Sequence, residues 1–136
     1  MSRADRLLLI DKSAFTRRGA EQVPGEPCLC TVTRLEILYS ARSPDDYLAL
    51  DAHLDSYREL RVNAETFAIA RTAQRDLARG GRHRVPMPDL LIGACAQQHA
   101  ADVLHVDRHY ELLAGVLSFT PLRLDDERDE VTDSAD

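Results

Sequence analysis

The stretch Leu7-Leu8-Leu9-Ile10-Asp11 is a short apolar run that ends on an acidic residue. A continuous apolar run of this length is typical of a buried strand, because an exposed edge strand would alternate with polar residues. The run is far too short to be a signal-peptide core or a membrane span, so we expect a cytoplasmic protein. In α/β proteins, a carboxylate directly after a buried strand stands where ligands bind.

Helical and extended patterns alternate along the rest of the chain. We expect strands at residues 6–10, 28–31, 60–62, 102–106 and 118–124, and helices at residues 13–18, 31–41, 43–56, 64–79, 88–99 and 108–116. The signals are helix caps such as Ser43 before Pro44, and the Gly80-Gly81 pair after an amphipathic stretch. This alternation predicts one α/β domain, residues 1–124, with a central, mostly parallel sheet flanked by helices.

The formal net charge of −6 is concentrated in the last twelve residues. Residues 125–136 hold seven acidic residues against a single arginine, so residues 1–124 contain 16 acidic and 16 basic residues. We interpret residues 125–136 as an acidic, disordered tail. The acidic balance of the whole chain therefore does not exclude a polyanionic substrate.

Four acidic residues recur where an apolar run meets the start of a helix: Asp11, Glu36, Asp89 and Asp107. Carboxylates gathered in one pocket repel each other, and a hard divalent cation among them relieves that repulsion. If these four side chains converge, the residue types favour a metal-dependent phosphodiester hydrolase.

The motifs around these acids resemble those of a known family. They are Ile-Asp-Lys-Ser-Ala at residues 10–14, Thr-Arg-Leu-Glu-Ile at 33–37, Pro-Asp-Leu-Leu-Ile-Gly-Ala at 88–94 and Val-Asp-Arg-His-Tyr at 106–110. In this order and spacing they resemble the PIN domain, and more narrowly the VapC-type ribonuclease toxins of bacterial toxin–antitoxin pairs. The resemblance covers roughly residues 6–124 and implies a PIN-like fold.

The resemblance implies a ribonuclease that uses Mg²⁺ or Mn²⁺, forms a homodimer and is held inactive by a cognate VapB-like antitoxin. It places the family's acidic metal-site positions on Asp11, Glu36, Asp89 and Asp107, and its small hydroxyl residue on Ser13. One departure stands out. Many relatives carry a further acid two residues after the last of these positions, where this chain has His109. This difference either weakens a second metal site or alters which metal is preferred.

The chemistry of these residue types is consistent with that implication. We expect Asp11 to be the central ligand, with Asp89 and Asp107 beside it and Glu36 acting directly or through a water molecule. Ser13 either caps a helix or supports a ligand. Four arginines are candidates for contacting the RNA backbone: Arg34, Arg82, Arg84 and Arg108.

Several alternative enzyme classes lack a residue that they need. A phosphorylation receiver needs a lysine near its last strand, and the only lysine here is Lys12. A haloacid-dehalogenase-type phosphatase needs a second Asp where this chain has Ser13, and no Gly-x-Gly-x-x-Gly motif follows the first strand. Two readings stay open beside the toxin: a housekeeping RNA-processing PIN nuclease, and a non-catalytic PIN module that binds RNA or protein.

Overall fold

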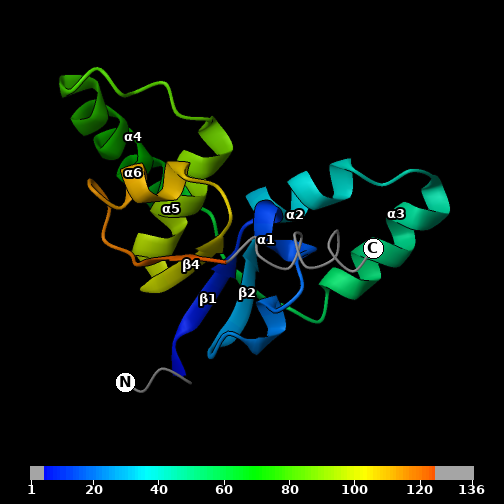
Figure 1. Ribbon diagram of the computed structural model, residues 1–136. Helices are drawn as coiled ribbons and strands as arrows, with labels where there is room; N and C mark the ends of the chain where they lie inside the picture. The colour runs from blue at the N-terminus through cyan, green and yellow to red at the C-terminus, as the bar shows by residue number, and fades with distance from the viewer. Residues whose placement is uncertain (1–4, 125–136) are drawn as a thin grey trace, which may run out of the picture.

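A computed structural model describes residues 5–124 and shows a five-stranded sheet with helices on both faces (Figure 1). The strands are β1 (Leu7–Ile10), β2 (Glu26–Cys30), β3 (Arg58–Leu60), β4 (Ala101–His105) and β5 (Pro121–Arg123). They run in the order β3-β2-β1-β4-β5, and every pairing is parallel. The predicted α/β class is confirmed, and the sheet is wholly rather than mostly parallel.

The helices connect these strands as the alternation predicts. They are α1 (Lys12–Phe15), the short 3-10 helix η2 (Ala20–Gln22), α2 (Thr31–Tyr39), α3 (Pro44–Leu54), α4 (Ala64–Arg79), α5 (Met87–His99) and α6 (His109–Leu113). Helix α4 has the predicted bounds because Asn63 caps its first turn and Gly80 follows its last residue. Ser43 caps α3, accepting a hydrogen bond from the backbone of Asp46 at 3.0 Å.

Several predicted boundaries are wrong. The strand predicted at residues 28–31 is β2, which begins two residues earlier. The helix predicted at residues 13–18 is only α1, which is capped by Asp11 and not by Ser13. The helix predicted at 108–116 ends at residue 113, and the strand predicted at 118–124 shortens to β5. The strand predicted at 60–62 lies two residues earlier, because Leu60 pairs with the last residue of β2. A hydrogen-bonded partner strand sets that boundary, and the partner is not visible in a single sequence.

The alternation of side chains along β1 divides the interior into two cores. Leu9 joins a cluster with residues of α4, α5 and α6 on one face of the sheet. Leu8 and Ile10 point to the opposite face, where they pack with residues of α1, α2 and α3. A central parallel strand is covered on both faces, which explains why β1 is apolar at every position.

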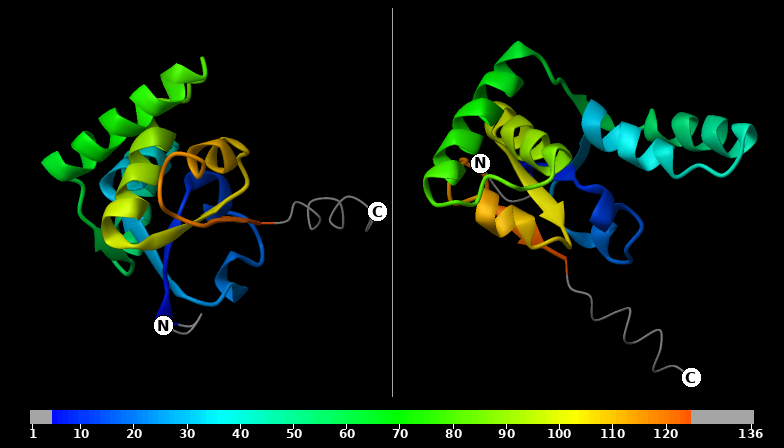
Figure 2. Two further views of the ribbon diagram at one scale, coloured as in Figure 1. Left: turned by 90° about the vertical axis from the view of Figure 1, so that its left-hand side faces the viewer. Right: turned by 90° about the horizontal axis from the view of Figure 1, so that it is seen from above.

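Helices α2 and α3 form an arm that projects from the body of the molecule, as the right-hand view of Figure 2 shows. Leu54 is the only residue of α3 that is fully buried. The side chain of Arg34 on α2 ties the two helices together, because it donates to Asp51 at 2.6 Å and to Asp55 at 2.7 Å. None of the helices in residues 5–124 is long and apolar enough to cross a membrane.

The strand order reverses direction between β1 and β4. The chain adds β2 and β3 on one side of β1, and β4 and β5 on the other. Such a switch point opens a crevice beyond the carboxyl ends of the two central strands. Asp11 follows β1 and Asp107 lies just past β4, so the topology brings both to this crevice. The tail predicted at residues 125–136 lies outside the described residues.

Candidate metal centre

Asp11 is held at the centre of the site by its backbone and by both carboxylate oxygens. It is 4% exposed. Its backbone N–H donates to the carbonyl of Leu104 on β4 at 2.9 Å. Oδ2 accepts from the backbone N–H of Ser13 at 2.9 Å, and Oδ1 accepts from the hydroxyl of Tyr110 at 2.6 Å. The side chain therefore has one defined orientation.

Asp89 and Asp107 meet on the other side of the crevice around His109. Asp89 lies in the first turn of α5, behind Pro88, and is almost fully buried. The Nδ1 atom of His109 lies 3.1 Å from Oδ2 of Asp89 and 2.8 Å from Oδ1 of Asp107. The backbone N–H of His109 also donates to Asp107 at 2.9 Å. Each of these three side chains offers one ligand atom, and all three atoms lie within 4.8 Å of one another.

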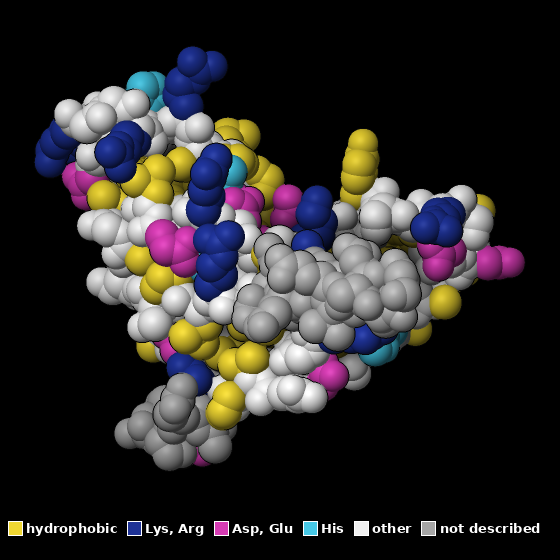
Figure 3. Space-filling model, viewed as in Figure 1, with side chains coloured by type: hydrophobic (Ala, Val, Ile, Leu, Met, Phe, Trp, Pro, Cys, Tyr) yellow, Lys and Arg dark blue, Asp and Glu magenta, His cyan; other side chains and the backbone are white. Residues whose placement is uncertain are grey.

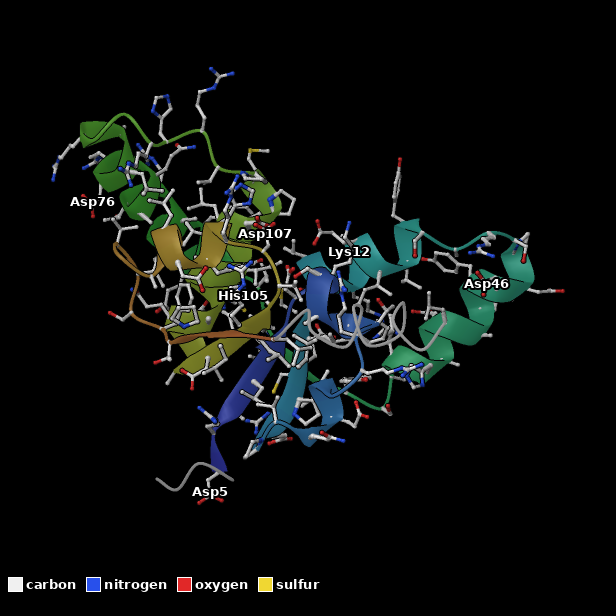
Figure 4. The ribbon with its side chains drawn as sticks, in the orientation of Figure 1. Asp5, Lys12, Asp46, Asp76, His105 and Asp107 are labelled. Carbon is white, nitrogen blue, oxygen red and sulfur yellow. The ribbon has the colours of Figure 1, made fainter. Side chains whose placement is uncertain are left out.

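The charges of the four predicted acids affect one another. The pKa of Asp89 is raised to about 6, first by burial and then by the charges of Asp11, Asp107 and Glu36, while His109 opposes the shift. Burial and the charge of Asp11 likewise raise the pKa of Glu36. The structure thus brings together the acids that the sequence separates by up to 96 residues. Figure 4 shows the labelled residues Asp107 and Lys12 at this end of the sheet, beyond the carboxyl ends of β1 and β4.

The hydroxyl of Ser13 has a different partner from the one expected. Its Oγ accepts from the backbone N–H of Val106 at 2.9 Å. Val106 precedes Asp107, so Ser13 anchors the segment that carries this acid to the segment that carries Asp11. The helix-cap role belongs to Asp11. Ser13 is therefore a link between two acid-bearing loops.

Tyr110 is a site residue that the sequence analysis missed. It is fully buried, and its hydroxyl donates to Asp11 and lies 3.4 Å from Oδ1 of Asp89. Burial and the neighbouring acids raise its pKa well above the usual range, so the phenol stays protonated. From the sequence alone, Tyr110 is predicted to be a buried aromatic residue of the core. The available signal was its position three residues after Asp107, at the start of a helix next to the crevice.

The four candidate substrate arginines divide into two groups. Arg82, Arg84 and Arg108 are exposed. Arg34 is instead committed to α3 through Asp51 and Asp55, and substrate contact by this residue stays a prediction. Lys and Arg side chains gather at the α4 end of the face seen in Figure 3.

The donor set is suited to a hard cation. Asp89, Asp107 and His109 each place one ligand atom within 4.8 Å of the others. Among the described residues, Lys12 is the basic side chain that opposes the rise in the pKa of Glu36. Oxygen ligands of this kind are those that Mg²⁺ and Mn²⁺ prefer, and His109 adds one nitrogen. Such a centre can activate water and neutralise a phosphate diester.

Comparison with known proteins identifies the family. The PIN domain family model matches residues 8–116. The chain belongs to the PIN domain family. Within it, the chain groups with the VapC proteins. Ribonuclease VapC17 of Mycobacterium tuberculosis is 42% identical over 116 residues, covering 79% of this chain and 87% of the relative. Ribonuclease VapC51 of the same species is 34% identical over 102 residues, covering 74% of each chain.

Solved structures agree with the fold of this PIN domain. VapBC-5 from M. tuberculosis, a member of the VapBC family of toxin–antitoxin systems, has a TM-score of 0.73 at 24% identity, covering 88% of this chain and 100% of that chain. VapBC2 from Rickettsia felis, bound to a promoter DNA fragment, has a TM-score of 0.70 at 12% identity and the same coverage. The predicted PIN-like fold is confirmed.

Proposed function

We propose that this PIN-domain protein is a metal-dependent endoribonuclease toxin in which Asp11, Glu36, Asp89 and Asp107 hold Mg²⁺ or Mn²⁺. The observation that carries the proposal is the grouping of ligand atoms from Asp89, Asp107 and His109 within 4.8 Å of one another, with Asp11 joined to this group through the hydroxyl of Tyr110. A cluster with so much uncompensated charge is stabilised by a cation. Similarity to the VapC ribonucleases supports RNA as the substrate.

A bound divalent ion lowers the pKa of a coordinated water and stabilises negative charge on the phosphate. The chain's own residues prepare the site for that chemistry. Asp11, fixed at both oxygens, supplies the central ligand. Asp89 and Asp107 flank it, and Glu36, half-buried on α2, orients the attacking water. All four acids are present, which disfavours a non-catalytic binding module.

The substrate is held by charge rather than by base stacking. Arg82 and Arg84 lie on the exposed loop between α4 and α5, and Arg108 lies directly after Asp107. Guanidinium groups bind phosphate oxygens in a bidentate manner, so we expect these residues to bind the RNA backbone.

An antitoxin of the VapB type docks on the α2–α3 arm in this proposal. The arm exposes four large apolar side chains, Leu35, Tyr39, Tyr47 and Leu48. Exposed apolar clusters of this kind mark protein interfaces. The similarity to VapBC toxin–antitoxin structures supports this partner. Tyr39→Ala is expected to weaken neutralisation by the antitoxin without lowering cleavage.

A second copy of the chain packs against α4 and α5. A groove of about 200 Å³ between these helices is lined by Phe67, Leu90 and Leu91, and Phe67 and Met87 are exposed beside it. Covering this apolar groove favours a homodimer. Phe67→Glu is expected to give a monomer in size-exclusion chromatography with light scattering.

The central experiment is cleavage of a structured RNA by the purified chain in Mn²⁺, with and without EDTA. Asp11→Asn is expected to abolish both cleavage and growth inhibition on expression. Asp46→Asn makes the same chemical change at the far end of the arm (Figure 4) and is expected to retain full activity. Wild-type cleavage by Asp11→Asn would disprove the assignment.

A further inference from the structure

The hydroxyl of Tyr110 is a polar group buried among the carboxylates. Tyr110 lies on α6, three residues after Asp107, and none of its surface is exposed. The hydroxyl donates to Oδ1 of Asp11 at 2.6 Å and lies 3.4 Å from Oδ1 of Asp89. One oxygen atom therefore contacts acids carried by α5 and by the end of β1.

The ring of Tyr110 is fixed by packing on two sides. Its centroid lies 5.0 Å from that of His105 and 6.4 Å from that of Phe119, with interplanar angles of 47° and 77°. These contacts are aromatic arrangements that stabilise a ring in one orientation. The phenol cannot swing away from the crevice, so the position of its oxygen is set by the fold.

The hydrogen bond leaves Asp11 free to bind a cation. An ionised carboxylate has about four acceptor sites. The backbone N–H of Ser13 occupies one on Oδ2, and Tyr110 occupies one on Oδ1. Each oxygen keeps a lone pair, while the plane of the carboxylate is fixed by a donor on either side.

We propose that Tyr110 is a positioning residue that sets the orientation of Asp11 for metal binding. The proposal rests on the assignment of Asp11 as a ligand. Partners of this kind commonly contribute 10–100-fold to metal affinity or activity. Losing such a hydrogen bond lowers metal affinity because the ligand side chain, no longer held in its binding orientation, must be ordered when the metal binds.

The test compares Tyr110→Phe with the wild type by Mn²⁺ titration, with free Mn²⁺ followed by electron paramagnetic resonance. Phenylalanine keeps every packing atom and removes only the hydroxyl. We expect the Kd for Mn²⁺ to rise by roughly 10-fold or more. Tyr57→Phe is the matched control, because Tyr57 is a half-buried tyrosine that packs on Phe15 and His53; its Kd should equal that of the wild type.

The outcomes separate this inference from the proposed function. Asp11→Asn is titrated in parallel, and wild-type Mn²⁺ affinity in that variant would overturn the metal site itself. If Asp11→Asn loses Mn²⁺ but Tyr110→Phe binds it within about twofold of the wild type, the role of Tyr110 alone is overturned. Thermal melts in EDTA establish that each variant is folded. Tyr110→Met, which also lacks the hydroxyl, carries the same expectation should the phenylalanine variant not fold.

Discussion

The Nδ1 atom of His109 lies 3.1 Å from Oδ2 of Asp89. The same nitrogen lies 2.8 Å from Oδ1 of Asp107. An imidazole thus stands between two carboxylates, two residues after Asp107. A nitrogen donor changes which metals a site favours, since imidazole suits nickel and zinc better than magnesium.

Replacing His109 by aspartate is expected to shift the metal preference toward Mg²⁺. The substitution exchanges a nitrogen donor for oxygen donors, so the ratio of Ni²⁺ to Mg²⁺ affinity should fall by on the order of tenfold. Competition titrations of the two metals measure that ratio. His83→Asp adds the same charge on the exposed α4–α5 loop and should leave the ratio unchanged. An unchanged ratio in His109→Asp would show that the imidazole is not a ligand.

The pKa of Asp89 predicts that the metal-free protein loses stability as the pH rises. This pKa is about 6 in the folded state, against 3.8 for an unperturbed aspartate. The folded state holds the proton more tightly, so the contribution is fully present below pH 3.8 and is lost as the pH rises through 6. The shift corresponds to at most about 3 kcal/mol. Saturating Mn²⁺ should reverse the loss, because it neutralises the ionised cluster.

Urea unfolding in EDTA at pH 5 and pH 7.5 measures this effect. Asp89→Asn has no carboxyl to titrate, so its free energy of unfolding should fall less than that of the wild type over the same interval. Asp76→Asn, at a half-buried position on α4 where Asp76 pairs with Arg79, is a control for loss of an acid elsewhere. Equal pH dependence in wild type and Asp89→Asn would contradict the cause assigned to the shift.

The sequence predicts most of the fold because its signals are local. The helix at residues 64–79 is defined by an Asn63 cap and a following glycine, both of which act within one turn. The order of the acids and their place after apolar runs predict which carboxylates meet, since parallel strands end at the same edge.

What the sequence misses depends on contacts between distant segments. The bonds Ser13 Oγ–Val106 and Tyr110–Asp11 join residues 93 and 99 positions apart. No local pattern encodes either of them. A tyrosine in an apolar run predicts a core position, and only the packed structure shows that its hydroxyl reaches a carboxylate.

Arg34 is expected to stabilise the arm rather than to bind substrate. Its guanidinium donates to the side chain and the carbonyl of Asp51 and to the side chain of Asp55. Arg34→Ala should therefore raise the rate of hydrogen exchange in α3 while RNA cleavage falls less than twofold. The loss of stability should be about 1 kcal/mol, because these ion pairs are partly exposed. Asp51→Asn should show the same increase in hydrogen exchange and the same loss of stability as Arg34→Ala. If Arg34→Ala loses most RNA cleavage while hydrogen exchange in α3 is unchanged, Arg34 contacts the substrate and does not stabilise the arm.

Ser13→Ala is expected to loosen the link between the loops that carry Asp11 and Asp107. The substitution leaves the backbone N–H of Val106 without its acceptor, which should cost about 1–2 kcal/mol of unfolding free energy. Because Asp107 follows Val106 directly, the Mn²⁺ affinity should fall as well.

Ser13→Thr retains the hydroxyl and should restore both the unfolding free energy and the Mn²⁺ affinity. Ser56→Ala removes an exposed hydroxyl at the end of α3 and should change neither. Chemical denaturation and Mn²⁺ titration of the three variants measure the two effects. If stability falls in Ser13→Ala with no change in metal affinity, the Ser13 hydroxyl supports the fold but not the position of Asp107.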